Sequence, residues 1–263
     1  RFQRSEVAIH KSIIYNSVAV IVPCVDFAVS YQFRIRIVAC HPNMPAPADC
    51  TADADADYCI AVISGDFVQR GAPALLNKYD RAKMALENGI DLVIELPVIT
   101  ATSSAENFAQ GGVCLLNALG VVSQISFGAE ANTASDVNLL GRLADFFAFE
   151  PPIFQEYLDQ ALKSGCSFPA ARAKAALTCL QQAKHHSMDS QTLAQFEQLL
   201  ASPNNILAIE YMKAIRRHNC KLTPSVVTRT GAGYHDADTD TALASASALR
   251  KFIFQDNSCQ KAD

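Results

Sequence analysis

Several features are scarce or missing in this 263-residue chain. It has no tryptophan, and its 22 basic and 26 acidic side chains nearly cancel to a net charge of −4. So small a charge gives no general attraction to nucleic acids or membranes, although a local basic patch remains possible. The most apolar stretch near the N-terminus, 13–29, is interrupted by Asn16, Pro23 and Asp26. A membrane-spanning helix needs about 20 mostly apolar residues, so we expect no membrane partner.

Paired metal-binding cysteine motifs are also missing. No two of the nine cysteines form a CxxC pair, and their number is odd. This pattern indicates reduced thiols in a cytoplasmic protein and argues against a disulfide framework or zinc site. The alternating Asp53, Asp55 and Asp57 lack the glycine turn and closing glutamate of a calcium loop. The adjacent His185 and His186 point different ways on a helix. We therefore expect no metal held by protein side chains alone.

The regular part of the chain, from residue 58, alternates short apolar runs with helical patterns. Strands are predicted at 59–63, 91–96 and 121–127, with helices at 79–88 and 104–119 between them. This alternation predicts an α/β fold with a parallel sheet and helices on its faces. The chain then becomes almost wholly helical, at 135–147, 152–164, 168–184, 190–200 and 205–218. A strand at 225–228 and a helix at 245–254 close the pattern.

Three predicted domains follow from this organisation. Residues 1–50 are an atypical N-terminal segment of uncertain fold, with β-prone runs at 17–25 and 33–40. Residues 51–254 form a nucleotide-binding α/β domain that includes a helical part at about 135–218. Residues 255–263 are a tail.

Small polar residues follow each of the first three strands of this domain. In an open α/β sheet ligands bind beyond the carboxyl ends of the strands, where helix N-termini present unpaired N–H groups to phosphate. The three strand ends are therefore the expected site: Ser64-Gly65-Asp66, Glu95-Leu96-Pro97 and Gly128-Ala129-Glu130. Alone they indicate a nucleotide-binding α/β domain.

A set of longer segments is more specific than this periodicity. They are "SGDFVQRGAPALLNKYDRAKMALENGIDLVIELP", "ATSSAENFAQGGVCLLNALGVV", "SFGAE", "SFPAARAKA", "SPNNILAIEYMKAI", "RTGAGYHD" and "LASASALR". In this order, over roughly residues 55–252, the chain closely resembles the bacterial tRNA(Met) cytidine acetate ligase family.

The resemblance implies a Rossmann-like nucleotidyltransferase fold and a two-step ligase reaction. ATP would activate acetate as acetyl-adenylate, and pyrophosphate departure would be helped by Mg²⁺. The acetyl group would then pass to N4 of the wobble cytidine of elongator tRNA(Met), giving N4-acetylcytidine. An anticodon loop already exposes that base.

The same resemblance assigns three residues to ATP. Gly128 of "SFGAE" would lie against the nucleotide, although it could be an ordinary strand-ending glycine. Asn204 of "SPNN" would contact ATP, with Asn205 a possible substitute; Ser202 or Asn204 could instead cap the following helix. Arg229 would contact ATP, with a surface salt bridge as the alternative.

Two further groups would complete the nucleotide site. Ser245, Ser247 and Arg250 of "SASALR" match a phosphate-binding helix start, with plain N-capping as the alternative. Ser64, Gly65 and Asp66 would line the acetate or α-phosphate end, with Gln69 and Arg70 at the rim.

One basic cluster lies near residue 217, formed by Lys213, Arg216, Arg217, His218 and Lys221. Such clusters at a helix end are usually solvated and favoured by the helix dipole. A contact with tRNA phosphates is the alternative.

The chain departs from the family in two places. The family's HxGH motif should fall near residues 38–44, which read "VACHPNM" here. His41 is alone, so no catalytic residue is assigned. The family also extends beyond the last helix into a C-terminal region that helps hold tRNA. We therefore expect impaired catalysis and a damaged or rearranged gene start. Alternatives are a small-molecule adenylyltransferase of the same fold and a non-catalytic nucleotide- or RNA-binding remnant.

Overall fold

The centre of the molecule is a five-stranded parallel sheet. The computed structural model describes residues 35–38, 58–87, 89–182 and 189–228. The strand order is β3-β2-β1-β4-β5, and every neighbouring pair is parallel. The strands are β1 (Ile35–Val38), β2 (Tyr58–Ser64), β3 (Leu92–Leu96), β4 (Gln124–Ala129) and β5 (Thr223–Thr228). The predicted α/β class with a parallel sheet is confirmed.

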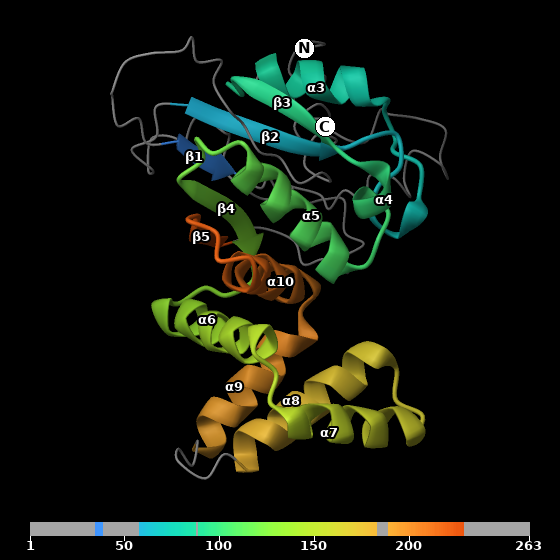
Figure 1. The fold of residues 1–263 in the computed structure, drawn as a ribbon, viewed down its shortest axis with the longest axis vertical. Helices are drawn as coiled ribbons and strands as arrows, with labels where there is room; N and C mark the ends of the chain where they lie inside the picture. Colours follow the sequence, from blue (N-terminus) through green and yellow to red (C-terminus); the bar gives the residue numbers. More distant parts are fainter. Residues whose placement is uncertain (1–34, 39–57, 88, 183–188, 229–263) are drawn as a thin grey trace, which may run out of the picture.

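Helices cover both faces of this sheet (Figure 1). They are α3 (Lys78–Glu87), α4 (Val98–Ala101), α5 (Ala105–Ala118), α6 (Ala134–Ala148), α7 (Pro152–Lys163), α8 (Phe168–Gln182), α9 (Ser190–Ala201) and α10 (Pro203–Arg217), with a 3₁₀ turn η1 (Gln69–Gly71). The β2–α3–β3 crossover runs toward one edge of the sheet, and the crossovers through α5 and α10 run toward the other. Right-handed crossovers therefore place α3 on one face and α5 with α10 on the opposite face.

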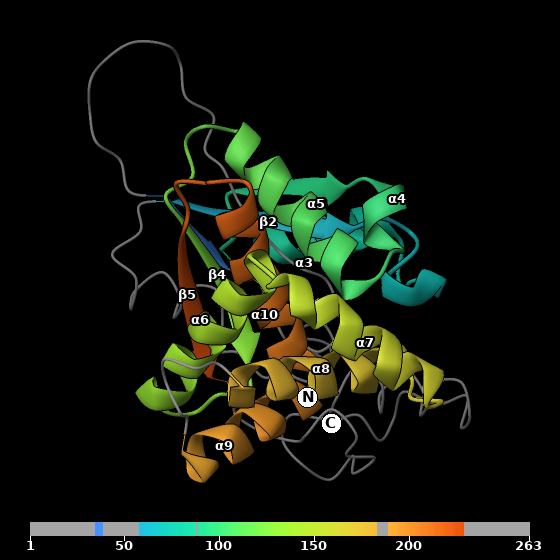
Figure 2. The same cartoon turned by 60° about the horizontal axis from the view of Figure 1, so that its bottom comes forward.

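The helical part extends from the sheet beyond α6 and α10. In both views α7, α8 and α9 lie furthest from the strands, and α6 and α10 lie between them and the sheet (Figures 1 and 2). Three phenylalanines join α6 to α7: Phe146 and Phe147 pack edge-on against Phe154, with ring centroids 5.5 and 6.0 Å apart. The helical part therefore has an aromatic joint to the body of the molecule.

Burial on both faces explains why the strands are continuous apolar runs. From Cys59 to Ser64 every residue of β2 is buried. Parallel sheets are covered by helices on both faces, so alternation disappears and the run is apolar throughout. Glycines follow the ends of α3 and α5. Gly89 and Gly120 have φ values of +91° and +70°, a left-handed conformation that other residues rarely adopt.

Most predicted boundaries agree with the structure to within one or two residues, and two elements differ. The strand predicted at 121–127 begins instead at Gln124, where pairing with Arg36 of β1 starts. The apolar Val121 and Val122 precede the ladder, and an apolar run alone does not show where pairing begins. The short helix α4, directly after Pro97, was missed.

The strand β1 changes the interpretation of the first 50 residues. It lies inside the β-prone run predicted at 33–40, and it pairs with β2 on one side and β4 on the other. Residues 35–38 thus contribute the central strand of the domain that was predicted to begin at residue 51. The predicted helix at 245–254 and the tail lie outside the described residues. None of the described helices is long and apolar enough to cross a membrane.

Candidate functional site at the carboxyl edge of the sheet

The strand order creates one topological switch point. From β1 the chain proceeds outward through β2 and β3, and then returns to the other side of β1 with β4 and β5. The carboxyl ends of β1 and β4 therefore flank the crevice where helices leave the sheet in opposite directions. Open α/β sheets bind their ligands at such a point. Adjacent strands lie about 4.8 Å apart, so the ends of β2 and β4 are separated by roughly 10 Å.

Two asparagines lock the start of α10 to the end of β4. The amide oxygen of Asn205 accepts hydrogen bonds from the backbone N–H groups of Glu130 (2.8 Å) and Ala131 (3.2 Å). Asn204 donates from Nδ2 to Oε1 of Glu130 at 2.7 Å. Both asparagines are buried. Gly128, in β4, precedes Glu130 by two residues. Asn204 and Asn205, named in the predicted nucleotide site, therefore bind the chain directly after the predicted Gly128.

The end of β2 is held by a second set of contacts. The carboxylate of Asp66 accepts a hydrogen bond from the backbone N–H of Lys78 at 3.0 Å, at the start of α3. A side chain added at Gly65 would collide with the carboxylate of Glu95. Glu95 is in turn paired with the Lys78 ammonium at 2.7 Å, and this hydrogen bond raises the pKa of Lys78. In this structure the Cα of Gly65 therefore faces Glu95.

A buried arginine lies behind this strand end. Arg81, on α3, is only 3% exposed. Its guanidinium donates to the carbonyl oxygens of Ser64 (2.9 Å) and Gly65, and through Nε to that of Leu76 (3.0 Å). Burial lowers the pKa of Arg81, while the nearby charges of Asp66 and Glu95 oppose that change. An arginine pKa is so high that the group still carries its charge at neutral pH.

Of the other predicted site residues, two lie in the described part of the chain and five lie outside it. Gln69 and Arg70 lie in η1, on the loop between β2 and α3. Arg229, Ser245, Ser247, Arg250 and the isolated His41 lie outside the described residues. Their assignments stay predictions, as do the ligand roles of Ser64, Gly65, Asp66, Gly128 and Asn204.

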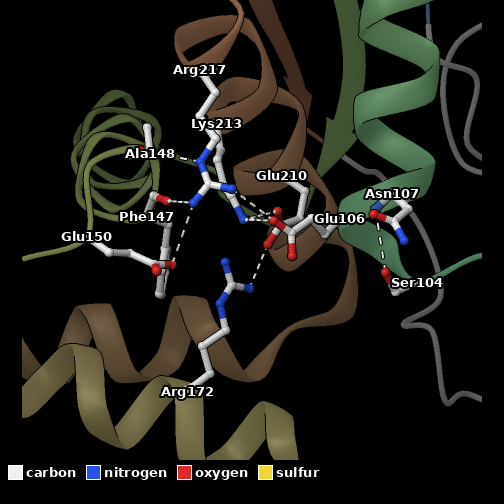
Figure 3. A network of polar contacts seen from close by, with 10 residues as sticks. All are labelled: Ser104, Glu106, Asn107, Phe147, Ala148, Glu150, Arg172, Glu210, Lys213 and Arg217. Atoms are coloured by element: carbon white, nitrogen blue, oxygen red, sulfur yellow. Dashed lines mark hydrogen bonds and ion pairs between the residues drawn. The ribbon is translucent and has the colours of Figure 1, made fainter. Parts of the chain in front are cut away.

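The basic cluster near residue 217 is only partly a solvated face: Arg217, His218 and Lys221 are exposed, whereas Lys213 is buried. Lys213 is buried and contacts Glu106 at 2.6 Å and Glu210 at 3.0 Å. Arg217 reaches Glu106 at 3.1 Å and the carbonyl oxygens of Phe147 and Ala148 (Figure 3). Arg216 pairs with Asp145. The sequence pattern missed these partners because they come from α5, α6 and α10 itself, in part more than 70 residues away.

A residue from the helical part completes this ionic network. Arg172 of α8 binds the buried Glu210 at 2.6 Å, and its guanidinium lies 3.9 Å from the centre of the Phe147 ring (Figure 3). At Glu106 burial raises the pKa, but the hydrogen bond and charge of Lys213, with Arg172 and Arg217, outweigh it. The net result is a pKa below the ordinary value. The network thus joins α5, α8 and α10.

The sequence analysis did not identify Arg81 and Arg172 as arginines that bind several polar partners inside the protein. A signal was available for Arg81, because it shares a helix face with the buried Met84 and Ala85 at i+3 and i+4. Arg172 has the same relation to the buried Ala175 and Ala176. A charged residue within an apolar helix face predicts burial with polar partners.

No metal site is formed by protein side chains in the described part of the chain. No group of three histidine, cysteine, aspartate or glutamate side chains is arranged to hold an ion there.

A doubly wound parallel sheet with small polar residues at its switch point defines a Rossmann-like nucleotide-binding domain. The sequence model for the HIGH nucleotidyl transferase family matches residues 48–263. The chain belongs to this family.

Curated relatives sharpen the comparison. A protein from Clostridium perfringens named tRNA(Met) cytidine acetate ligase is 47% identical over 202 residues, covering 76% of this chain and 48% of the relative. A protein of the same name from a Thermoanaerobacter species is 45% identical over 199 residues, covering 76% and 46%. The chain thus spans about half the length of the curated relatives it matches.

Solved structures show the same fold. The apo crystal structure of Thermotoga maritima TmcAL superposes with a TM-score of 0.73 at 30% identity, covering 88% of this chain and 52% of that protein. A second crystal structure of that protein, bound with alpha-thio ATP, gives a TM-score of 0.72 with the same coverage.

Proposed function

We propose that this chain is the nucleotide-binding part of an ATP-dependent tRNA-modifying ligase. The reaction activates acetate as acetyl-adenylate with release of pyrophosphate. It then transfers the acetyl group to N4 of the wobble cytidine of elongator tRNA(Met). The observation that carries the proposal is the junction of β4 and α10 at the switch point, where Asn204 and Asn205 bind Glu130, two residues after Gly128.

The relatives support the choice of reaction within this fold. Those that match at 45–47% identity carry the name tRNA(Met) cytidine acetate ligase, and a structural relative binds alpha-thio ATP. In the proposed site the nucleotide lies at the β4 end, with Gly128 against it. The acetate and α-phosphate end lies toward Ser64, Gly65 and Asp66, about 10 Å away across β1.

The backbone at the β4 end limits what it offers to ATP. The N–H groups of Glu130 and Ala131 are already used by Asn205, so they are not donors for phosphate. Contacts to the phosphates would then fall to side chains such as Asn204 and Arg229. Mg²⁺ would assist the departure of pyrophosphate.

The sequence at 38–44 favours a second candidate, a non-catalytic nucleotide- or RNA-binding protein. "VACHPNM" offers one histidine, His41, where the family has two and a glycine. Groups that stabilise developing phosphate charge contribute several powers of ten in rate. We therefore expect slow adenylation even where ATP binds. A small-molecule adenylyltransferase remains the third candidate.

The test is acetate-dependent pyrophosphate release from ATP by this chain, with and without tRNA(Met), alongside transfer of ¹⁴C-acetate to the tRNA. ATP binding is measured by calorimetry on the same preparation. Acetate-dependent release followed by labelled tRNA supports the ligase.

The other outcomes separate the alternatives. ATP binding without turnover supports the non-catalytic candidate, and turnover that does not respond to tRNA supports the small-molecule enzyme. A chain that binds neither ATP nor alpha-thio ATP contradicts the proposal. Asn204→Ala is the matched site variant, and Asn117→Ala, at an exposed position near the end of α5, is its control.

A further inference from the structure

The guanidinium of Arg81 is buried against backbone carbonyl groups. The three contacts of this side chain given above all go to backbone carbonyl oxygens, of Ser64, Gly65 and Leu76. A charged group that leaves water loses its hydration, and it is rarely fully buried unless polar partners replace that water. Three fixed carbonyl dipoles supply part of this replacement, beside the nearby charges of Asp66 and Glu95. An apolar side chain of similar volume would avoid the cost altogether, so the arginine calls for a role beyond filling space.

The contacts show what Arg81 fixes. Ser64 and Gly65 are the last residues of β2 and the first of the following loop, whereas Leu76 lies just before α3. One side chain therefore closes the loop of residues 65–77 by binding both of its ends. The loop's other ties agree with this: Asp66 caps the backbone of Lys78, and Ala74 donates to the carbonyl oxygen of Asp66 at 2.8 Å.

The planar shape of the guanidinium is needed for this arrangement. Nη2 and Nε donate to three carbonyl oxygens from one rigid plane, an arrangement that a lysine ammonium on a flexible stem cannot reproduce. The contacts of Arg81 also fix the path of the backbone at the end of β2. With both carbonyl oxygens of Ser64 and Gly65 turned toward Arg81, the position of the Asp66 backbone beside the switch point is set by α3.

We propose that Arg81 is a positioning residue for the acyl-donor end of the site. It holds Ser64, Gly65 and Asp66 in the geometry that accepts the carboxylate of acetate, without touching the substrate. The inference rests on the proposed function, which places acetate at the β2 end and the nucleotide at the β4 end. It predicts that loss of Arg81 weakens binding of the acetyl group and leaves the adenosine part unaffected.

Two ligands separate these ends without requiring turnover. 5′-O-(N-acetylsulfamoyl)adenosine mimics acetyl-adenylate, and 5′-O-sulfamoyladenosine lacks the acetyl group. Calorimetry gives the Kd of each for the full chain, for Arg81→Met and for Arg81→Lys. The control is Lys83→Met, on the same helix, whose side chain is 75% exposed and pairs only loosely with Glu87 at 3.9 Å. Thermal unfolding of every variant is recorded in parallel.

The expected result is a split between the two ligands. Arg81→Met and Arg81→Lys raise the Kd of the acetylated compound by about tenfold, because the strand end that meets the acetyl group is no longer held in place. The Kd of the compound without acetyl changes less than about twofold, and Lys83→Met changes neither.

The remaining outcomes each overturn a different statement. If the wild-type chain binds both compounds and Arg81→Lys binds them equally well, Arg81 has no positioning role and the proposed function stands. An equal loss for both compounds, together with a lower Tm, assigns Arg81 a purely structural role. If the wild-type chain binds neither compound, the proposed function fails, and the inference fails with it.

Discussion

At the scale of single residues, Asn205 holds the chain that follows β4. Its amide oxygen satisfies two consecutive backbone N–H groups after β4, while the side chain itself is 2% exposed. A buried N–H that loses its partner costs about 1–3 kcal/mol. The neighbouring Asn204 makes a side-chain contact with Glu130 instead. The two asparagines of "SPNN" therefore make different contacts.

Replacing Asn205 by leucine should lower the free energy of unfolding by about 2–4 kcal/mol, because the backbone N–H groups of Glu130 and of the buried Ala131 both lose the amide oxygen that accepts their hydrogen bonds. Asn205→Asp retains an acceptor oxygen and should lose less. Urea denaturation measures both, with Asn117→Ala as an exposed control. Equal stability of Asn205→Leu and the wild-type chain would show that water replaces the amide and that the β4–α10 junction does not depend on it.

At the scale of elements, the contact between α8 and α10 rests on charge. Arg172 binds Glu210 and stacks on Phe147, and Glu210 also has Lys213 at 3.0 Å. Removing one partner of a buried pair leaves the other charge poorly compensated. Here Lys213 remains, so the loss should be smaller than for an isolated pair.

Arg172→Met should destabilise the protein by about 2–3 kcal/mol, below the range for an unshared buried ion pair. Backbone amides of α7 and α8 should exchange with deuterium faster, whereas those of α5 and β2 should change little. Lys174→Met is the matched control, because this residue is exposed on the same helix. Uniformly faster exchange throughout the chain would contradict a role confined to the joint.

The same network predicts a dependence on pH. The pKa of Glu106 is lowered in the folded protein, so its contribution to stability is complete above the unfolded value of about 4.3. This contribution is lost as the pH falls through the lower, folded pKa. Wild-type stability should therefore decline more steeply than that of Glu106→Gln below about pH 4.5. The measurement is the free energy of unfolding of both proteins between pH 3 and 6. An equal decline in the two proteins would be inconsistent with an ionic role for Glu106.

At the scale of the whole molecule, the sequence predicts the helices and strands well and the contacts between them poorly. Apolar runs and helical periods depend on neighbours within a few residues, so β2, β3, α5 and the five helices from α6 to α10 were located almost to the residue. The contacts that join the elements link residues far apart in the sequence, such as Asn205 with Glu130 and Lys213 with Glu106. Local periodicity does not contain that information.

The first 50 residues illustrate the same limit. The run at 33–40 has a β-prone composition, but the family resemblance begins near residue 55, so nothing indicated where such a strand would pair. In the structure β1 is the central strand, with the β2–β3 pair on one side and the β4–β5 pair on the other. The two halves of the candidate site therefore depend on four residues upstream of the segment that carries the resemblance.

This position predicts a large effect from one substitution in β1. Ile37 is registered with Ile60 of β2 and Ile125 of β4, and proline there removes a ladder donor from the middle of the sheet. Because native proteins are stable by only about 5–15 kcal/mol, Ile37→Pro should lower the urea midpoint sharply and separate the unfolding of the two halves of the sheet. Ile37→Val keeps the N–H and should stay near wild type. If Ile37→Pro unfolds at the wild-type midpoint in one cooperative step, residues 35–38 do not hold the sheet together, and the ends of β2 and β4 must be aligned by the helices alone.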